Sequence, residues 1–333
     1  NFGQTAGRAT FGREGDYWSG GRLLVGRAKN TFRQMDGEDS SAAGLVRVGP
    51  LMGLAQLVRD LGHDPQAAFE RQRLAPDDFS DPDLEISFVR AGKLIESCVA
   101  ETGCPHLGLL LGQRIEPSSL GIPAYLLHTA RNVRAALVDL VRYFDLHDRG
   151  AVLTLDVDEK VARLGYAIYL PDVQAADHIY DLSIAVECNI MRGLCGAAWN
   201  AEEVRLARNA PKDMTPYESF FRAPIRFDAD HSAVVFPSRW LDHRVSSANS
   251  DLHNHLQRQA DDLHAKQPGD LVVQIRGLLR GSLALRRADA HNIARRLGLH
   301  ERTLNRRLHQ AGTSFRHELN AVRYQVAREL LVH

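Results

Sequence analysis

The sequence has few cysteines and no long apolar run, and each shortage excludes a class of protein. Four cysteines among 333 residues are too few to staple a fold of this size with disulfides. The pairs Cys98/Cys104 and Cys188/Cys195 lack the CxxC spacing of zinc and redox motifs, so we expect reduced, mostly buried thiols and a cytoplasmic location. No stretch approaches roughly 18 consecutive apolar residues, which excludes a membrane span and a membrane partner.

The usual motifs of enzymes and metal centres are also missing. The sequence has no GxGxxG after a strand, no GxxxxGK[ST], no HExxH and no GxSxG. His253 and His255 point to different faces of a predicted helix, and His128 and His147 lie at the edges of apolar faces. We therefore predict surface or hydrogen-bonded histidines, no catalytic residue, no metal, no cofactor and no enzyme activity.

Lysine is absent from the C-terminal segment, although the chain as a whole has a net charge of zero. Residues 270–333 contain 12 Arg and 5 Asp or Glu, a net charge of +7, which leaves −7 on the rest of the chain. An arginine-rich end on an acidic body is typical of a nucleic-acid-binding unit.

The N-terminal residues lack any sustained apolar period. Residues 1–34 contain seven Gly and six Arg or Lys, and Met35 is followed by a polar stretch typical of a natural N-terminus. Our hypothesis is that translation starts at Met35 and that residues 1–34 lie upstream of it. We expect residues 1–49 to form a disordered leader.

Residues 50–240 predict a mainly helical α+β domain with a core of its own. Apolar periodicity predicts helices over 51–61 and 88–101, a further helix with Asn132 as its N-cap, and a long helix over 176–195. Alternation predicts a hairpin with strands 151–156 and 161–170, and short strands at 204–207, 225–227 and 233–236. These elements mix without a βαβ rhythm, which indicates the α+β class.

Residues 241–270 predict a connector helix and a linker. Leu252, Leu256, Ala260 and Leu263 form a narrow apolar stripe. Such a stripe suits either a dimerisation or inter-domain helix, or a helix docked on its own domain. Residues 267–270, Gln-Pro-Gly-Asp, then mark a domain boundary.

The segment 288–310 has the pattern of a helix-turn-helix. Ile293 and Leu297 lie one helical turn apart, as do Leu304 and Leu308. Gly298 lies between the pairs and can adopt the left-handed conformation that ends the first helix. Two short helices would then pack through their apolar faces, and the second would present its other face outward.

The outward face of the second helix carries side chains that suit DNA. Arg can donate two hydrogen bonds to guanine, and Asn can pair similarly with adenine, so a row of both suits the major groove. The predicted base-facing residues are Glu301, Arg302, Asn305 and Arg306, and the predicted phosphate contacts are Thr303, Arg307, Arg295 and Arg296. The other interpretation is an ordinary amphipathic hairpin with a solvated arginine face.

The segment DAHNIARRLGLHERTLNRRLHQAGTSFRHELNAVRYQVARELL resembles the first helix-turn-helix of an AraC-family transcription regulator. The matching residues are Ile293-Ala294, Leu297-Gly298-Leu299, Arg302-Thr303-Leu304, Arg306-Arg307-Leu308, Gly312-Thr313-Ser314-Phe315, Arg323, Ala327 and Leu330-Leu331. Asn305 stands where close relatives often have Arg, so the half-site read here is expected to differ. The body, with its GIPAYLLHTA segment, is similar to the effector domain of an AraC subgroup that includes regulators of amino-acid metabolism.

The resemblance implies a sequence-specific transcription regulator controlled by a small-molecule effector, such as an amino acid or a related metabolite. Its implied partners are double-stranded promoter DNA, a second copy of the chain and RNA polymerase. Effector contacts are not assigned by the motifs; Tyr125, His128 and Tyr180 are the aromatic and polar candidates.

AraC-type DNA-binding domains have two helix-turn-helix units joined by a long helix, and residues 271–333 cover only the first unit and part of that helix. We therefore expect an all-α, incomplete DNA-binding domain, a C-terminal truncation and weak DNA binding by this chain. The alternative function is an effector-sensing or dimerisation protein that no longer binds DNA tightly.

Overall fold

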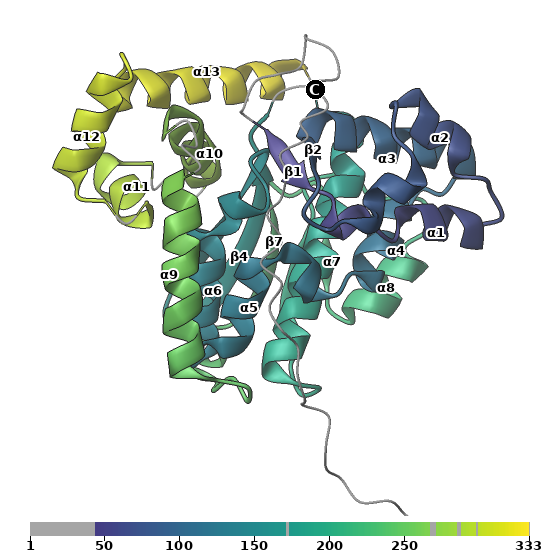
Figure 1. The fold of residues 1–333 in the computed structure, drawn as a ribbon, viewed down its shortest axis with the longest axis horizontal. Coiled ribbons are helices and arrows are strands. Elements are labelled where there is room, and N and C mark those ends of the chain that lie inside the picture. Colours follow the sequence, from purple (N-terminus) through teal and green to yellow (C-terminus); the bar gives the residue numbers. More distant parts are fainter. Residues whose placement is uncertain (1–43, 171–172, 267–270, 285–287, 298, 333) are drawn as a thin grey trace, which may run out of the picture. The chain divides into compact units, whose positions relative to one another are not determined.

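The structure, a computed structural model, describes residues 44–170, 173–266, 271–284, 288–297 and 299–332 (Figure 1). Predicted features at 1–43, 267–270 and Gly298 lie outside the described residues. The described helices and strands make up a mainly helical α+β fold with a mixed sheet, which confirms the predicted class.

The main sheet has five strands and is antiparallel apart from one pair. Its order is β3 (Ala151–Val157), β4 (Val161–Ile168), β7 (Ser232–Pro237), β5 (Glu203–Arg205) and β6 (Ile225–Arg226), with β5 and β6 parallel. The predicted hairpin is β3 and β4, with Leu153 opposite Tyr166. The three short predicted strands are β5, β6 and β7. A separate two-stranded sheet pairs β1 (Leu45–Arg47) with β2 (Glu85–Ser87).

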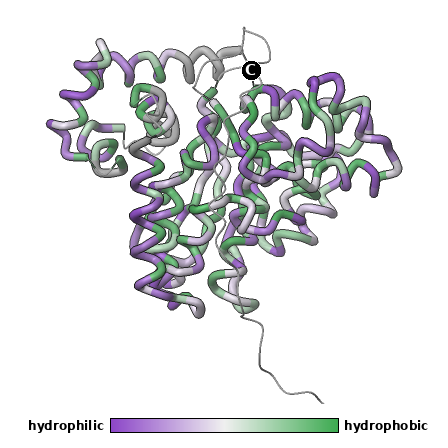
Figure 2. The backbone as a smooth tube through the Cα atoms, in the orientation of Figure 1, coloured by the Kyte–Doolittle hydropathy of each residue, from purple (hydrophilic) through white to green (hydrophobic). Residues whose placement is uncertain are grey.

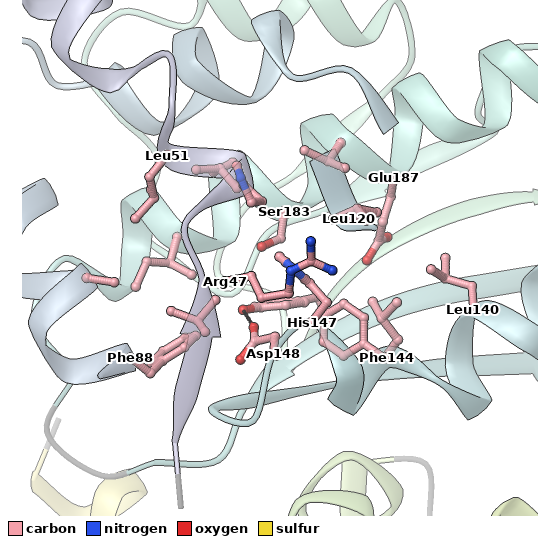
Figure 3. A pocket seen from close by; sticks show the side chains of 18 of the residues that line it. Arg47, Leu51, Phe88, Leu120, Leu140, Phe144, His147, Asp148, Ser183 and Glu187 are labelled. Carbon is pink, nitrogen blue, oxygen red and sulfur yellow. Dashed lines mark hydrogen bonds between the residues drawn. The ribbon is translucent and has the colours of Figure 1, made fainter. Parts of the chain in front are cut away.

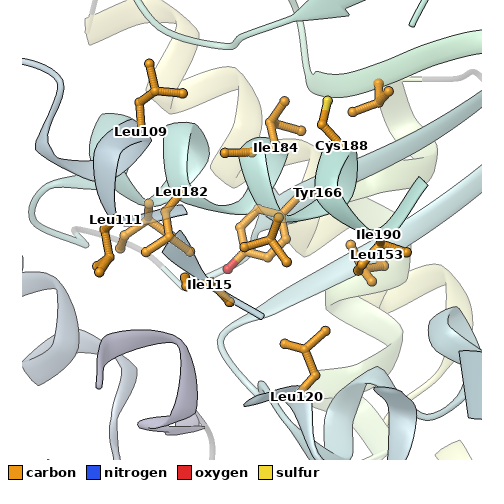
Figure 4. Packing of buried hydrophobic residues seen from close by; sticks show 14 of the residues in the cluster. Leu109, Leu111, Ile115, Leu120, Leu153, Tyr166, Leu182, Ile184, Cys188 and Ile190 are labelled. Atoms are coloured by element: carbon orange, nitrogen blue, oxygen red, sulfur yellow. The ribbon is translucent and has the colours of Figure 1, made fainter. Parts of the chain in front are cut away.

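Helix α7 (Ala176–Cys195) has the predicted bounds and forms the centre of the body. It contacts β4, β7 and, most closely, α4 (Leu107–Arg114). The close approach depends on Gly108 and Gly112, because a Cβ on Gly108 would lie 2.0 Å from the His178 carbonyl oxygen. Figure 4 shows the apolar side chains gathered around α7. The four cysteines are buried free thiols, as predicted.

Shorter helices surround this centre. The α-helices are α1 (Leu54–Asp60), α2 (Gln66–Arg71), α3 (Phe88–Thr102), α5 (Ile122–Thr129), α6 (Val133–Arg142) and α8 (Thr215–Phe221). The 3-10 helices are η1 (Gly49–Leu51), η2 (Pro76–Ser80), η3 (Pro117–Leu120), η4 (Phe144–Leu146) and η5 (Ser238–Asp242). The predicted N-cap of α6 is confirmed, because the Asn132 side chain accepts a hydrogen bond of 3.0 Å from the Ala135 amide.

Residues 44–49 belong to the body, which corrects the predicted extent of the leader. Strand β1 begins at Leu45, and Val46 pairs with Ile86 and is buried in the main core. A strand of three residues is too short to produce a recognisable alternation, so the sequence pattern begins only at the next helix.

Helix α9 (Ser250–Lys266) carries the predicted stripe and is docked on the body. Ala260 is fully buried in a cluster with Tyr143, whose hydroxyl donates a hydrogen bond of 2.8 Å to Asp261. Leu252 and Leu263, at the ends of the stripe, remain 46% and 38% exposed. The structure therefore favours the docked interpretation for the middle of the helix, although Figure 2 shows that many of its residues are hydrophilic.

Four helices follow and share a second, smaller core. They are α10 (Leu271–Ala284), α11 (Ala290–Arg296), α12 (Glu301–Gln310) and α13 (Phe315–Val332). Their buried residues form a cluster separate from the main one: Ile275, Leu278, Leu279, Ile293, Ala294, Leu304, Leu308 and Val322.

Candidate functional site

Helices α11 and α12 form the predicted helix-turn-helix. Ile293 of α11 and Leu304 and Leu308 of α12 are fully buried against one another and their neighbours. The Leu299 amide donates a hydrogen bond of 2.8 Å to the Ala294 carbonyl, which closes the end of the first helix. The apolar spacing read from the sequence therefore produced the expected packing.

Most of the residues that the sequence placed on the outer face of α12 are exposed there. Glu301, Arg302, Arg306 and Arg307 are exposed, whereas Thr303 and Asn305 are half-buried. The side chains of Arg295 and Arg296 lie outside those that the structure describes. The helix thus presents three guanidinium groups outward while two leucines anchor it from beneath, an arrangement that can contact phosphates and base edges.

A buried carboxylate, missed by the sequence patterns, fixes α13 to its neighbours. Glu318 is 1% exposed and accepts hydrogen bonds of 2.5 Å from Arg276 of α10 and from the Thr313 hydroxyl. Burial alone would raise the pKa of Glu318, but these two donors outweigh burial and hold it below its usual range. Glu318 therefore ties the start of α13 to α10 as an ionised group.

The body contains a partly open cavity beside α7 (Figure 3). Its volume is about 80 Å³, several times the roughly 10–15 Å³ that a single water needs. One face of α7 supplies Ile179, Leu182, Ser183, Val186, Glu187 and Ile190 to its wall. Side chains from α3, the β3–β4 hairpin and the β1–η1 segment close the other sides, so most of the lining is apolar.

One carboxyl of the cavity is well supplied with hydrogen bonds. Asp148 is 3% exposed, and its two oxygens accept 2.7 Å from the Gly150 amide and 2.9 Å from the Tyr166 hydroxyl. Burial raises the pKa of Asp148 to about 6, and these hydrogen bonds work in the opposite direction. Asp148 is therefore part of the structural framework of the cavity.

The other carboxyl of the cavity has no partner among the described residues. Glu187 is 3% exposed, and neither of its oxygens accepts a hydrogen bond there. Burial raises the pKa of Glu187 well above its usual range. Nδ1 of His147, which also lines the cavity, is likewise buried without a partner. This corrects the prediction that His147 is a surface or hydrogen-bonded histidine.

The aromatic and polar candidates suggested for effector contact do not line this cavity. Tyr125 and His128 are exposed, and the half-buried Tyr180 ring packs against the ring of Tyr166, at 6.2 Å between centroids. A sequence signal for Glu187 did exist, because it is the one charged position on the apolar stripe 179–190 that lines the wall. Periodicity alone could not show that this stripe borders a cavity.

The remaining histidine predictions agree with the structure. His253 lies 3.0 Å from the Thr129 hydroxyl and 3.1 Å from Asp139, and His128 and His255 are exposed. Within the described ranges, no group of three or more His, Cys, Asp or Glu side chains is placed to hold a metal ion. The described helices also include none with the length and apolarity needed to cross a membrane.

Comparison with known proteins finds similar transcription regulators. The chain is 28% identical over 295 residues to the ornithine utilization regulator of Pseudomonas aeruginosa, covering 87% of this chain and 86% of that protein. It is 25% identical over 272 residues to the HTH-type transcriptional regulator VirS of Mycobacterium tuberculosis, covering 80% and 79%. A crystal structure of the transcriptional regulator CdpR from Pseudomonas aeruginosa aligns with a TM-score of 0.46 and 22% identity, covering 82% of this chain and 84% of that one.

The family comparison is decisive because it covers more than half of the chain. The family described as the arabinose-binding domain of AraC transcription regulators, N-terminal, matches residues 62–245. These residues include most of the elements that line the cavity, from α3 to α7. The chain therefore belongs to the AraC family of transcription regulators, with an effector domain of the arabinose-binding type.

Proposed function

We propose that this protein regulates transcription by placing α12 in the major groove of a promoter. Arg302, Asn305 and Arg306 contact base edges, with Glu301 at the start of the same face. Thr303, Arg307 and Arg296 contact phosphates. The observation that carries this proposal is the outward row on α12, held in place by the buried Leu304 and Leu308.

Charge supports the same assignment. The 12 Arg and 5 acidic residues of 270–333 produce a net positive charge on the part of the chain that contains α12. Because the DNA backbone is densely anionic, a basic unit of this kind gains affinity for any DNA sequence, and the base contacts then select among sequences.

The effector is proposed to bind in the cavity beside α7 and to act on the helix-turn-helix through α10. The hairpin supplies Leu153 and Tyr166 to the cavity, and α10 packs against the same hairpin. A Cβ on Gly277 of α10 would lie 2.8 Å from a methyl carbon of Val152 and 2.7 Å from the Tyr169 ring. An effector that binds two positions of the hairpin with different affinity would therefore shift α10.

The effector class is proposed to be an amino acid or a related metabolite. One relative is named as a regulator of ornithine utilization, and it aligns with 87% of this chain. The proposed organisation is an effector domain up to residue 240, a connector over 241–270 and a DNA-binding unit over 271–333. A second copy of the chain and RNA polymerase are the proposed protein partners, in the cytoplasm.

Replacing Arg306 or Asn305 with alanine tests the base contacts. Each change is expected to cost about 1–3 kcal/mol, roughly 5- to 150-fold in affinity, and to relax specificity at one base position. The measurement uses the full chain and a duplex that the wild-type protein selects from a random pool, followed by every single-base variant of that duplex. An equal loss on all variants would reassign the residue to a phosphate contact.

Replacing Arg307 with alanine is the matched test of a phosphate contact on the same helix. Affinity is expected to fall by a similar factor on every duplex, because a phosphate carries no sequence information. The slope of log affinity against log salt concentration should become shallower by roughly one. A sequence-dependent loss with an unchanged salt slope would contradict this role.

A further inference from the structure

Glu187 is a buried acidic residue within the effector domain. It lies in the middle of α7, its carboxyl is buried, and neither oxygen has a hydrogen-bond donor among the described residues. Asp148, in the same cavity, shows the usual arrangement, with a donor on each oxygen. Because an unpartnered buried polar group costs stability, its presence indicates a partner that binds from outside.

The cations near the cavity do not serve as that partner. Arg47 lines the cavity, but its guanidinium is paired with Asp83 and also donates to the Pro82 carbonyl. Burial, and secondly the charge of Arg47, lowers the pKa of His147 to about 3, so its imidazole is neutral near pH 7. Figure 3 shows Glu187, His147 and Arg47 on the wall of the same space.

The remaining polar groups of the cavity indicate which functional group of a ligand would pair with Glu187. Ser183 lies one helical turn before Glu187 on the cavity face of α7, and its hydroxyl is hydrogen-bonded to the Tyr166 hydroxyl. Because Tyr166 donates its own proton to Asp148, Ser183 donates to Tyr166, and the Ser183 oxygen is left as a second acceptor in the cavity. An ammonium group has three N–H donors and a positive charge, which matches a carboxylate flanked by a neutral acceptor. The aliphatic wall and the small volume suit a short apolar chain behind that ammonium.

We propose that the cavity binds a small ligand with a protonated primary amine on a short aliphatic chain, and that Glu187 receives the ammonium group. This inference rests on the proposed effector role of the cavity, and it adds the chemical class of the ligand and the residue that recognises it. The ligand supplies the charge that the protein lacks at this position. The charge-assisted hydrogen bond formed in this mostly apolar cavity then favours the ionised carboxylate.

The test compares three four-carbon probes on the full chain. n-Butylamine, 1-butanol and butyrate, adjusted to one pH, are titrated by calorimetry and followed by the shift in melting temperature. We expect n-butylamine to bind at least tenfold more tightly than either other probe. Equal binding of 1-butanol and n-butylamine would show that the apolar wall alone selects the ligand. Tighter binding of butyrate would show that a cation of the protein selects it. Either result overturns the proposal.

Two variants locate the effect. Glu187→Gln preserves the shape of the side chain and removes its charge, and it should abolish the preference for n-butylamine over 1-butanol. Glu202→Gln makes the same change at an exposed position outside the cavity and should bind like the wild type. Unchanged amine preference in Glu187→Gln would overturn the proposal. Should this variant fail to fold, the order of the three probes on the wild type still decides.

Ornithine provides a further arm on the same protein. Tighter binding of ornithine than of n-butylamine would identify the ligand as a basic amino acid, whereas weaker binding would identify it as a simple amine. In both cases the ammonium group binds to Glu187, as proposed. Loss of ornithine binding with Glu187→Gln but not with Glu202→Gln identifies the same anchor. Ornithine binding that is equal in both variants would show that Glu187 does not receive the ammonium group.

The melting temperature of unliganded Glu187→Gln serves as a folding control, and the direction of its difference from the wild type can be predicted. The raised pKa of Glu187 means that the folded protein loses stability as pH rises above the ordinary range of glutamate. The variant should therefore melt higher than the wild type at about pH 8 and gain less at about pH 5. Arg47, His147, Asp148 and Tyr166 also face the cavity, but both proteins carry them.

DNA binding measured alongside separates this inference from the proposed function. No amine binding with intact DNA binding would overturn the ligand assignment alone. Amine binding that leaves DNA affinity unchanged would confirm the site and overturn its role as the effector cavity.

Discussion

Replacing Leu304 with aspartate is expected to unfold the α11–α12 unit and abolish DNA binding by the full chain. Leu304 is fully buried in a small cluster, with eight buried members among the side chains that the structure describes. Loss of a buried leucine costs about 2–5 kcal/mol, and an unpaired charge in an apolar core adds several more. A core this small cannot compensate for that loss. Hydrogen exchange of the α11 and α12 amides and a gel-shift titration measure the two effects.

Arg306→Asp is the matched control, because it introduces the same residue on the exposed face of the same helix. The control should lose DNA binding but keep its amide protection, whereas Leu304→Asp should lose both. Retained protection in Leu304→Asp would show that α12 does not depend on this leucine as an anchor. Retained DNA binding in the control would remove Arg306 from the contact surface.

Replacing Gly108 with alanine is expected to destabilise the effector domain by about 3 kcal/mol or more, since overpacking typically costs about 1–3 kcal/mol. The new Cβ would meet the His178 carbonyl oxygen at 2.0 Å, its carbonyl carbon at 2.7 Å and its Cα at 2.7 Å. Backbone atoms in the middle of a packed helix pair cannot move aside as a flexible side chain can. Thermal unfolding should show a fall of roughly 2–4 °C for each kcal/mol.

Gly193→Ala makes the identical change within α7, where nothing lies within 4 Å of the new Cβ. This control is expected to gain up to about 1 kcal/mol, because glycine inside a helix is less favourable than alanine. The two variants should therefore shift the melting temperature in opposite directions. A common shift would mean that helix propensity, rather than the approach of α4 to α7, sets the effect. Gly108→Ala should also weaken ligand binding, because α7 forms one wall of the cavity.

The sequence pattern located helices most accurately where one face of the helix is apolar and the other is polar. Helix α6 was located by its N-cap Asn132, α7 by its apolar stripe, and α12 by Leu304 and Leu308. In such elements the period of the sequence and the period of the structure coincide, because water lies on one side only. The resemblance to the AraC family rested on the same C-terminal residues and agrees with the family match on the body.

Elements without that contrast were missed. Helix α4, LGLLLGQR, is apolar on nearly every side and has no polar face to produce a period. Strand β1 has three residues, so residues 44–49 were assigned to the leader. The assignment of His147 failed for a related reason: a histidine at the edge of an apolar face is buried or exposed according to what covers that face, and here the cavity lining covers it.

The sequence by itself determined the family and the composition of the outward face of α12, because both depend on residues within one local stretch of chain. Only the tertiary structure decided that Glu187 borders a cavity and lacks a partner there. That outcome depends on residues such as Phe88 of α3, Leu153 of β3 and Val46 of β1. They are far from Glu187 in sequence and line the same cavity only when the chain packs. Whether a carboxyl has a donor depends on every group that surrounds it, and no periodicity within α7 contains that information.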